Sequence, residues 1–261
     1  MSSDKILLTA GCSYTDKNFQ SLDTTAANRG GWSMWPELMS AELNLQCVNV
    51  AKSGISNDTI FNNLMDAIVE YGDKIDTVAV MWTTGDRIPF FYETIIPLAE
   101  LHIRNMTNRS DDLDRWMDNR PAGNAVLEFF DNPKFDMNKM LEHCMVSTLR
   151  KMYELIQVCK VNNYKLVMAQ GPAYFDETPF GSKVDKVSPF INNQYFNQLE
   201  KHRDKIIGWP LLSDLGGWDL DLRRAAYQDT TVSEKDYHPN AFGQKIFADL
   251  FIGKWRNTYG K

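Results

Sequence analysis

The sequence has few cysteines and few histidines. Its 261 residues include four of each. The cysteines show neither a CxxC motif nor Cys/His pairing at the spacing of a metal site: Cys12, Cys47, Cys144 and Cys159. This pattern is typical of reduced thiols rather than of a disulfide framework or a zinc site. We therefore expect no structural metal in this chain.

Long apolar runs are also missing. No segment approaches the roughly 20 apolar residues that a membrane helix needs. The apolar run after the N-terminal Lys5 is too short for the core of a signal peptide. The sequence thus predicts a cytoplasmic protein with no membrane partner.

An excess of positive charge is likewise absent. The chain carries 28 Lys and Arg against 34 Asp and Glu, which gives a formal net charge of -6. Without a local basic patch, such a chain has no electrostatic attraction for a nucleic acid. Its 43% hydrophobic content is ordinary for a globular protein with a sizeable core. Nucleic acid is therefore excluded as the expected partner.

Short apolar runs alternate with segments of helical periodicity. Strands are predicted at residues 6–8, 45–51, 76–82, 164–170 and 204–212. Helices are predicted at residues 33–44, with a serine as N-cap, and at 56–72, 137–163 and 241–255. Strands separated by helices imply βαβ units. The pattern predicts an α/β fold, a three-layer α/β/α sandwich around a parallel sheet of about five strands.

One stretch interrupts this alternation. Residues 86–133 are rich in Asn, Asp, Arg and Pro and have poor periodicity. We interpret them as an insertion after the third strand. The prediction is a single domain over residues 1–261 that carries this insertion.

Two polar residues near opposite ends of the chain are candidates for catalysis. Ser13 follows the first predicted strand in "GCSYTD", and His238 precedes the last helix in "DYHPN". Ligands bind at the carboxyl ends of strands in parallel sheets, and Ser13 lies at such an end. Pro239 and Asn240, a typical helix cap, fix His238 in a loop. The other histidines have sequence surroundings typical of surface or core-edge positions: His102, His143 and His202.

A serine hydrolase also needs a carboxylate that orients the imidazole. Asp236 stands two residues before His238, and in an extended segment such residues point to the same side. Glu234 is the reserve candidate. Cys12, beside Ser13, is expected to pack inward as a small apolar residue rather than to act as a nucleophile.

Three segments resemble the SGNH or GDSL hydrolases. "GCSYTD" is similar to the first block of that family, which carries the nucleophilic serine, with Cys12 where Asp is usual. "NVAKSGISND" at residues 49–58 is similar to the second block, and "DYHPNAFG" to the last. The resemblance implies a flavodoxin-like sheet and ester hydrolysis with no metal or organic cofactor. It also implies roles for Ser13, Asp236 and His238 as a triad, and for the backbone N–H of Gly54 as an oxyanion donor.

The sequence departs from this family at two positions. Lys235 stands where the last block usually has its Asp, three residues before the histidine. In the third block, usually Gly-x-Asn-Asp, this chain has "TTGD", so that Gly85 replaces the Asn that completes the oxyanion hole. Thr84 or a backbone N–H is the candidate replacement.

Other residues suit substrate binding or a structural role. Arg87 follows the third block and suits either a substrate carboxylate or phosphate, or a structural ion pair. Aromatic residues near the site suit either stacking on a sugar or packing in the core: Trp32, Trp82, Phe90, Phe91, Tyr92 and Trp116.

Two functions follow from these patterns. The first is a serine esterase that acts on a small-molecule or glycan ester and removes a small acyl group from a carbohydrate or another polar alcohol. The alternative is a non-catalytic binding or structural protein that keeps the SGNH fold with a degenerate oxyanion hole. The missing Asn favours the alternative, and the sequence leaves the oligomeric state open.

Overall fold

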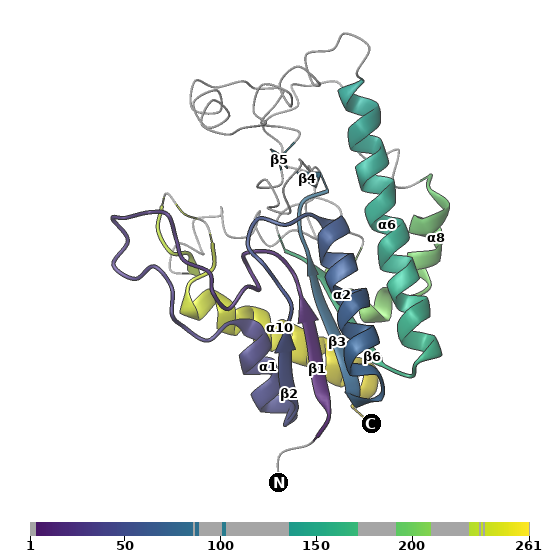
Figure 1. Ribbon diagram of the computed structural model, residues 1–261, viewed down its shortest axis with the longest axis horizontal. Helices are drawn as coiled ribbons and strands as arrows, with labels where there is room; N and C mark the ends of the chain where they lie inside the picture. The colour runs from purple at the N-terminus through teal and green to yellow at the C-terminus, as the bar shows by residue number, and fades with distance from the viewer. Residues whose placement is uncertain are drawn as a thin grey trace.

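The structure is a computed structural model, and it describes residues 4–85, 87, 88, 101, 102, 136–171, 192–209, 230–234, 236 and 238–260. A parallel sheet forms its centre, with strand order β2-β1-β3-β6 (Figure 1). These strands are β1 (Ile6–Ala10), β2 (Gln46–Asn49), β3 (Ile75–Trp82) and β6 (Lys165–Gln170). The predicted α/β fold with a parallel sheet is confirmed.

The prediction of about five strands in the sheet is one strand too high, because the described residues form a central sheet of four. At the predicted fifth strand, Arg203–Lys205 forms a short 3-10 turn, η2, that takes these residues out of the sheet. Only Ile206 forms a bridge there, parallel to Met168 of β6. Ile206 therefore lies beside β6 on the edge away from β3, where a flavodoxin-like sheet has its fifth strand. Residues 210–212 of the predicted strand lie outside the described residues.

Helices cover both faces of the sheet (Figure 1). On one face lie α1 (Trp35–Leu43) and α10 (Ala241–Tyr259). On the other lie α2 (Asn57–Tyr71) and α6 (Met137–Val161), and α8 (Gln194–Glu200) packs against α6. The predicted three layers are thus present.

Alternate residues of the strands enter two separate cores. Leu8, Val80 and Met168 pack toward α2 and α6, whereas Leu7 and Met81 pack toward α1 and α10. Both sets are fully buried. A parallel sheet with helices on both faces needs apolar residues at consecutive positions, which explains the unbroken apolar runs in the sequence.

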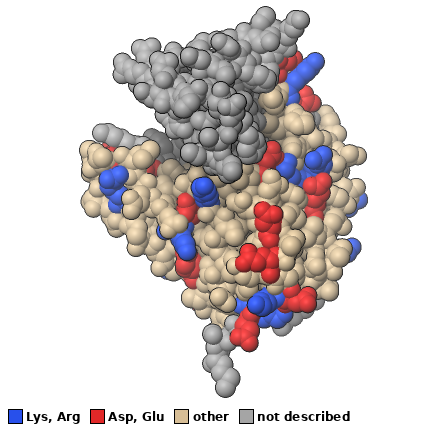
Figure 2. Space-filling model, in the orientation of Figure 1, with Lys and Arg blue, Asp and Glu red and all other residues tan. Residues whose placement is uncertain are grey.

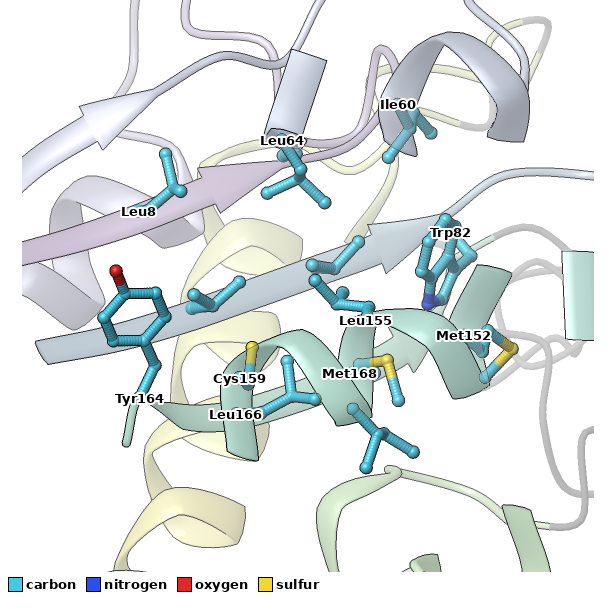
Figure 3. Packing of buried hydrophobic residues seen from close by; sticks show 14 of the residues in the cluster. Leu8, Ile60, Leu64, Trp82, Met152, Leu155, Cys159, Tyr164, Leu166 and Met168 are labelled. Carbon is cyan, nitrogen blue, oxygen red and sulfur yellow. The ribbon is translucent and has the colours of Figure 1, made fainter. Parts of the chain in front are cut away.

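Figure 3 shows the first of these cores at close range. Leu8 and Trp82 extend from the sheet, and Leu64 and Leu155 meet them from α2 and α6. At the edge of this core, the hydroxyl of Tyr164 donates a hydrogen bond to the Gly72 carbonyl at 3.0 Å. The polar end of this ring is therefore satisfied where the core reaches the surface.

The helix ends differ in how well they were predicted. Ser56 caps α2, at the predicted start of this helix, and accepts a hydrogen bond from Thr59 N at 3.3 Å. The predicted serine cap of α1 is wrong. Met34 occupies the N-cap position, and its backbone N–H donates to the Glu37 carboxylate at 2.9 Å. Glu37 therefore satisfies the backbone at this end of the helix.

Three features were not predicted. No helix was predicted at α8, and α10 continues past its predicted end at residue 255 to Tyr259. Within the predicted insertion, β4 (Arg87–Ile88) pairs antiparallel with β5 (Leu101–His102). The rest of residues 86–133 lies outside the described residues, so the single domain with an insertion stays a prediction.

Charged side chains of both signs are interspersed on the face shown in Figure 2. This mixture agrees with the small net charge of -6. In the part of the chain that the structure describes, no helix combines the length and apolar character needed to cross a bilayer.

The start of α10 packs tightly against the loop of residues 230–240. A Cβ atom at Gly243 would lie 2.4 Å from the Thr230 carbonyl oxygen and 2.8 Å from Pro239 Cβ. Only glycine permits this approach. The helix therefore fixes the position of the loop that carries Asp236 and His238.

This packing predicts opposite effects for two substitutions in α10. Gly243→Ala should lower the free energy of unfolding by about 1 to 3 kcal/mol, because the added methyl group overlaps the loop. The control is Gly253→Ala, where an added Cβ meets nothing within 4 Å. It should be neutral or stabilise by up to about 1 kcal/mol through helix propensity. Urea denaturation measures both values, and equal effects would contradict the packing argument.

Candidate active site

Ser13 lies in a turn directly after β1. The backbone N–H groups of Thr15 and Asp16 donate to the Cys12 carbonyl at 2.9 and 3.0 Å, which closes the turn. At Gly11 a Cβ atom would lie 2.2 Å from Thr15 Oγ1, so the sharp exit from the strand requires glycine. The Ser13 side chain is thereby held at the carboxyl end of the central strand.

His238 lies between Ser13 and Asp236. Its Nε2 is 2.8 Å from Ser13 Oγ, and its Nδ1 is 2.5 Å from Asp236 Oδ1. An ionised carboxylate only accepts hydrogen bonds, so Nδ1–H donates to Asp236 and Nε2 accepts from the Ser13 hydroxyl. The structure brings together the three residues that the sequence analysis combined. Glu234, the reserve candidate, is exposed.

Two aromatic rings hold the imidazole of His238. Phe19 stacks on it, with ring centroids 4.4 Å apart and an angle of 29° between the planes. Tyr14 meets it edge-on at 5.2 Å and 76°. These contacts limit rotation of the imidazole, which is the motion that would break its bond to Ser13. Neither ring was predicted to lie in the site.

Asn240 connects the His238 loop to α10. Its Oδ1 accepts from the backbone N–H groups of Phe242 and Gly243 at 2.9 and 3.1 Å, and its Nδ2 donates to the Thr231 carbonyl at 2.8 Å. The predicted N-cap is therefore confirmed. The same side chain closes the loop and begins the helix.

Gly54 lies in the loop after β2, with φ +81° and an exposed backbone. Its neighbour Ser53 donates from N and Oγ to Asp16 Oδ2 at 2.8 and 2.7 Å. Asp16 is buried, and its Oδ1 accepts from Asn18 N at 2.9 Å. Asp16 thus joins the Ser13 loop to the Gly54 loop. It stands in the first block of the sequence, but the sequence analysis gave it no role.

The loop after β3 carries the remaining predicted residues. Thr84 is buried, and its hydroxyl has no hydrogen-bond partner among the described residues. The Arg87 guanidinium donates to the Ile55 carbonyl at 3.3 Å, next to Gly54 in the chain. The side chain of Asn57 bonds to both the backbone N–H and the carbonyl of Thr83. This amide is engaged with the backbone at the end of β3.

Two further expectations concern Cys12 and the aromatic residues. Cys12 is fully buried, which confirms that it packs inward. Trp82 belongs to the core between the sheet, α2 and α6, so the core alternative holds for this residue. Trp32 is half-buried. The other aromatic residues considered for sugar stacking lie outside the described residues: Phe90, Phe91, Tyr92 and Trp116.

Within the described ranges, no group of three or more His, Cys, Asp or Glu side chains is arranged to hold a metal ion.

Comparisons with known proteins find similar structures but no similar sequences. No protein-family model matches the sequence, and no curated protein matches it. LAE5, an alpha/beta hydrolase from the metagenome of Lake Arreo, has 16% identity and a TM-score of 0.46, over 99% of this chain and 98% of that one. Axe2, an acetylxylan esterase from Geobacillus stearothermophilus, has 16% identity and a TM-score of 0.44, over 98% and 96%.

A GDSL-like lipase from Parabacteroides merdae has 12% identity and a TM-score of 0.42, over 100% of this chain and 97% of that one. Several such neighbours are esterases or lipases by name. The fold itself is established here by the parallel strand order of the chain's own sheet.

The contacts of Asp236 predict a pH-dependent contribution to stability. Burial by itself would raise the pKa of Asp236, but hydrogen bonds from His238 and Ser21 outweigh it and hold the pKa well below the ordinary value of 3.8. A lowered pKa in the folded state contributes stability above the ordinary value, and this is lost as the pH falls toward the folded-state pKa. The wild-type advantage over Asp236→Asn should therefore shrink below about pH 4.

Denaturant unfolding at a series of pH values measures this difference. Asp249→Asn is the control, because Asp249 is an exposed carboxylate that pairs with Lys245 on the surface of α10. Its effect should stay small at every pH. A difference between wild type and Asp236→Asn that stays constant into acid would contradict the prediction.

Proposed function

We propose that the protein is a serine-dependent ester hydrolase of the SGNH type. The observation that carries this proposal is the continuous hydrogen-bond chain from Ser13 through His238 to Asp236. A hydroxyl, an imidazole and a carboxylate in this order are the groups that activate a serine nucleophile. Ser13 is nearly buried, whereas about a third of the His238 side chain is exposed, at 32%.

In the proposed reaction, Ser13 Oγ attacks the ester carbonyl carbon while His238 Nε2 takes the hydroxyl proton. Asp236 stabilises the imidazolium through Nδ1. His238 then gives the proton to the leaving alcohol, and an acyl group remains on Ser13. Water activated by His238 releases the acid and restores the hydroxyl.

The negative charge on the carbonyl oxygen needs hydrogen-bond donors. We assign this role to the backbone N–H groups of Ser13 and Gly54, with Thr84 as the third donor in place of the missing Asn. The link from Asp16 to Ser53 supports the assignment of Gly54, because it holds the Gly54 loop beside the Ser13 loop. The unpartnered hydroxyl of Thr84, as far as the described residues show, has a proton to donate.

The proposed substrate is a small acyl ester of a carbohydrate or another polar alcohol. The sequence offers no long apolar segment to cover an acyl chain. Arg87, bonded to the backbone at Ile55, is the proposed contact for a polar or anionic part of the substrate. The protein is proposed to act in the cytoplasm, without nucleic acid, membrane, metal or cofactor.

A non-catalytic binding or structural role is the second candidate. It is favoured by Gly85, which stands where the family has an oxyanion-binding Asn. With too few hydrogen-bond donors, the negative charge on the carbonyl oxygen would be poorly stabilised, and Ser13 would attack the ester slowly. The two candidate functions make opposite predictions for ester hydrolysis after the Ser13 hydroxyl is removed.

Removing the Ser13 hydroxyl should abolish ester hydrolysis. Ser13→Ala is expected to lower kcat for p-nitrophenyl acetate by at least about 10³-fold, because no other group is proposed to attack the ester. A fluorophosphonate should label Ser13 in the wild type. The matched control is Ser40→Ala, since Ser40 is also buried but donates to the Glu37 carbonyl within α1. Equal turnover by wild type and Ser13→Ala, without labelling, would favour the non-catalytic role.

Thr84 can be tested by a substitution that keeps its shape. Thr84→Val removes the hydroxyl and should lower kcat by about 10²-fold with little change in KM, as expected for an oxyanion donor. Thr77→Val is the control, because Thr77 is fully buried near the other end of β3. An unchanged kcat would show that backbone donors suffice and would remove Thr84 from the site.

A further inference from the structure

The segment of residues 19–23, which we call the brace segment, contacts both partners of Ser13. Phe19 stacks on the His238 ring at 4.4 Å, and the hydroxyl of Ser21 donates a hydrogen bond to Asp236 Oδ2. One side of the brace segment therefore faces the imidazole and its carboxylate.

A third contact, made by Asp23, joins the brace segment to the loop of Asp236 and His238. Asp23 Oδ2 accepts from Ser233 Oγ at 2.5 Å, in the loop that carries Asp236. Positions 19, 21 and 23 thus meet that loop at 238, 236 and 233. The three contacts run in opposite chain directions along the segment and the loop, although more than 200 residues of chain separate them.

Ser21 is held from several directions. It is fully buried, and its backbone N–H donates to the Arg29 carbonyl at 2.7 Å. The Arg29 guanidinium donates back to the Ser21 carbonyl from Nε at 2.9 Å and from Nη2 at 2.6 Å. The Asp23 N–H donates to Ser21 Oγ at 3.1 Å. Since the oxygen accepts from Asp23, the single hydroxyl proton of Ser21 is free to point to Asp236.

The two oxygens of Asp236 have separate donors. Oδ1 accepts from Nδ1 and from the backbone N–H of His238, at 2.5 and 3.0 Å, while Oδ2 accepts from Ser21. The side chain is only 12% exposed, so water has little access to replace a lost donor. A buried carboxylate that loses a donor is destabilised and tends to rotate toward a new one. Ser21 opposes this rotation.

We propose that Ser21 is a positioning residue, which holds Asp236 Oδ1 against His238 Nδ1 so that Nε2 stays directed at Ser13. This inference rests on the proposed function, because positioning matters to the rate only if His238 moves a proton. It adds a fourth member to the hydrogen-bond chain, one that touches neither substrate nor reacting atoms.

The test compares Ser21→Ala with Ser21→Thr, which keeps a hydroxyl, and with Ser40→Ala as the control. With p-nitrophenyl acetate, Ser21→Ala should lower kcat about 10- to 100-fold, as for the loss of a hydrogen bond to a charged group, with KM nearly unchanged. Ser21→Thr should recover most of the rate, and Ser40→Ala should leave it unchanged. A kcat of Ser21→Ala equal to wild type would overturn the proposal, as would a folded Ser21→Thr with no recovery.

Proton NMR gives a second readout that does not depend on turnover. The Nδ1–H proton of His238, assigned by its absence in His238→Gln, should resonate far downfield because of its short bond to Asp236. In Ser21→Ala this signal should shift upfield or broaden, whereas Ser40→Ala should retain it. A signal unchanged in Ser21→Ala would overturn the positioning role. A wild type that shows this signal without any turnover would overturn the esterase proposal alone.

Discussion

The side-chain amide of Gln244 connects the two ends of the chain. This residue is fully buried, its Oε1 accepts from Trp35 N at 2.9 Å, and its Nε2 donates to the Tyr14 carbonyl at 3.1 Å. A buried amide with both atoms bonded fixes α10 relative to the loop after β1 at distances that packing alone does not specify. Tyr14 follows Ser13 in the chain and α10 begins three residues after His238, so this amide joins the two segments that make the 2.8 Å contact between Ser13 and His238.

Three loops from different parts of the chain are joined around Ser13 by polar contacts. Asp16 bonds to the loop of Gly54, and the brace segment bonds to the loop of Asp236 and His238. Each contact uses a buried or half-buried acceptor that would be costly to leave without a donor. The sheet positions the ends of the strands, and these carboxylates then set the loops relative to one another.

The sequence predicted the features that depend on local patterns. The apolar runs and helical periodicity located the four strands, and Ser13, Asp236 and His238 were recognised from their residue types and positions next to these elements. Ser21, Phe19 and Asp16 were missed because their contacts join distant segments and their residue types are common in loops. The fifth strand was overestimated because apolar residues after a 3-10 turn look like a strand in the sequence. The cap of α1 was misassigned because Met34, rather than a serine, takes the N-cap position, and Glu37 accepts a hydrogen bond from its backbone N–H.

The position of His238 so late in the chain has a consequence for biosynthesis. A nascent chain that has emerged as far as β6 contains Ser13, Gly54 and the central strands, but it does not yet contain Asp236 or His238. The contacts of the brace segment with the loop of Asp236 and His238, including the one from Ser21 to Asp236, have no partner at that stage. The contacts of the loop after β1 with His238 and Gln244 therefore form only after translation has passed residue 244.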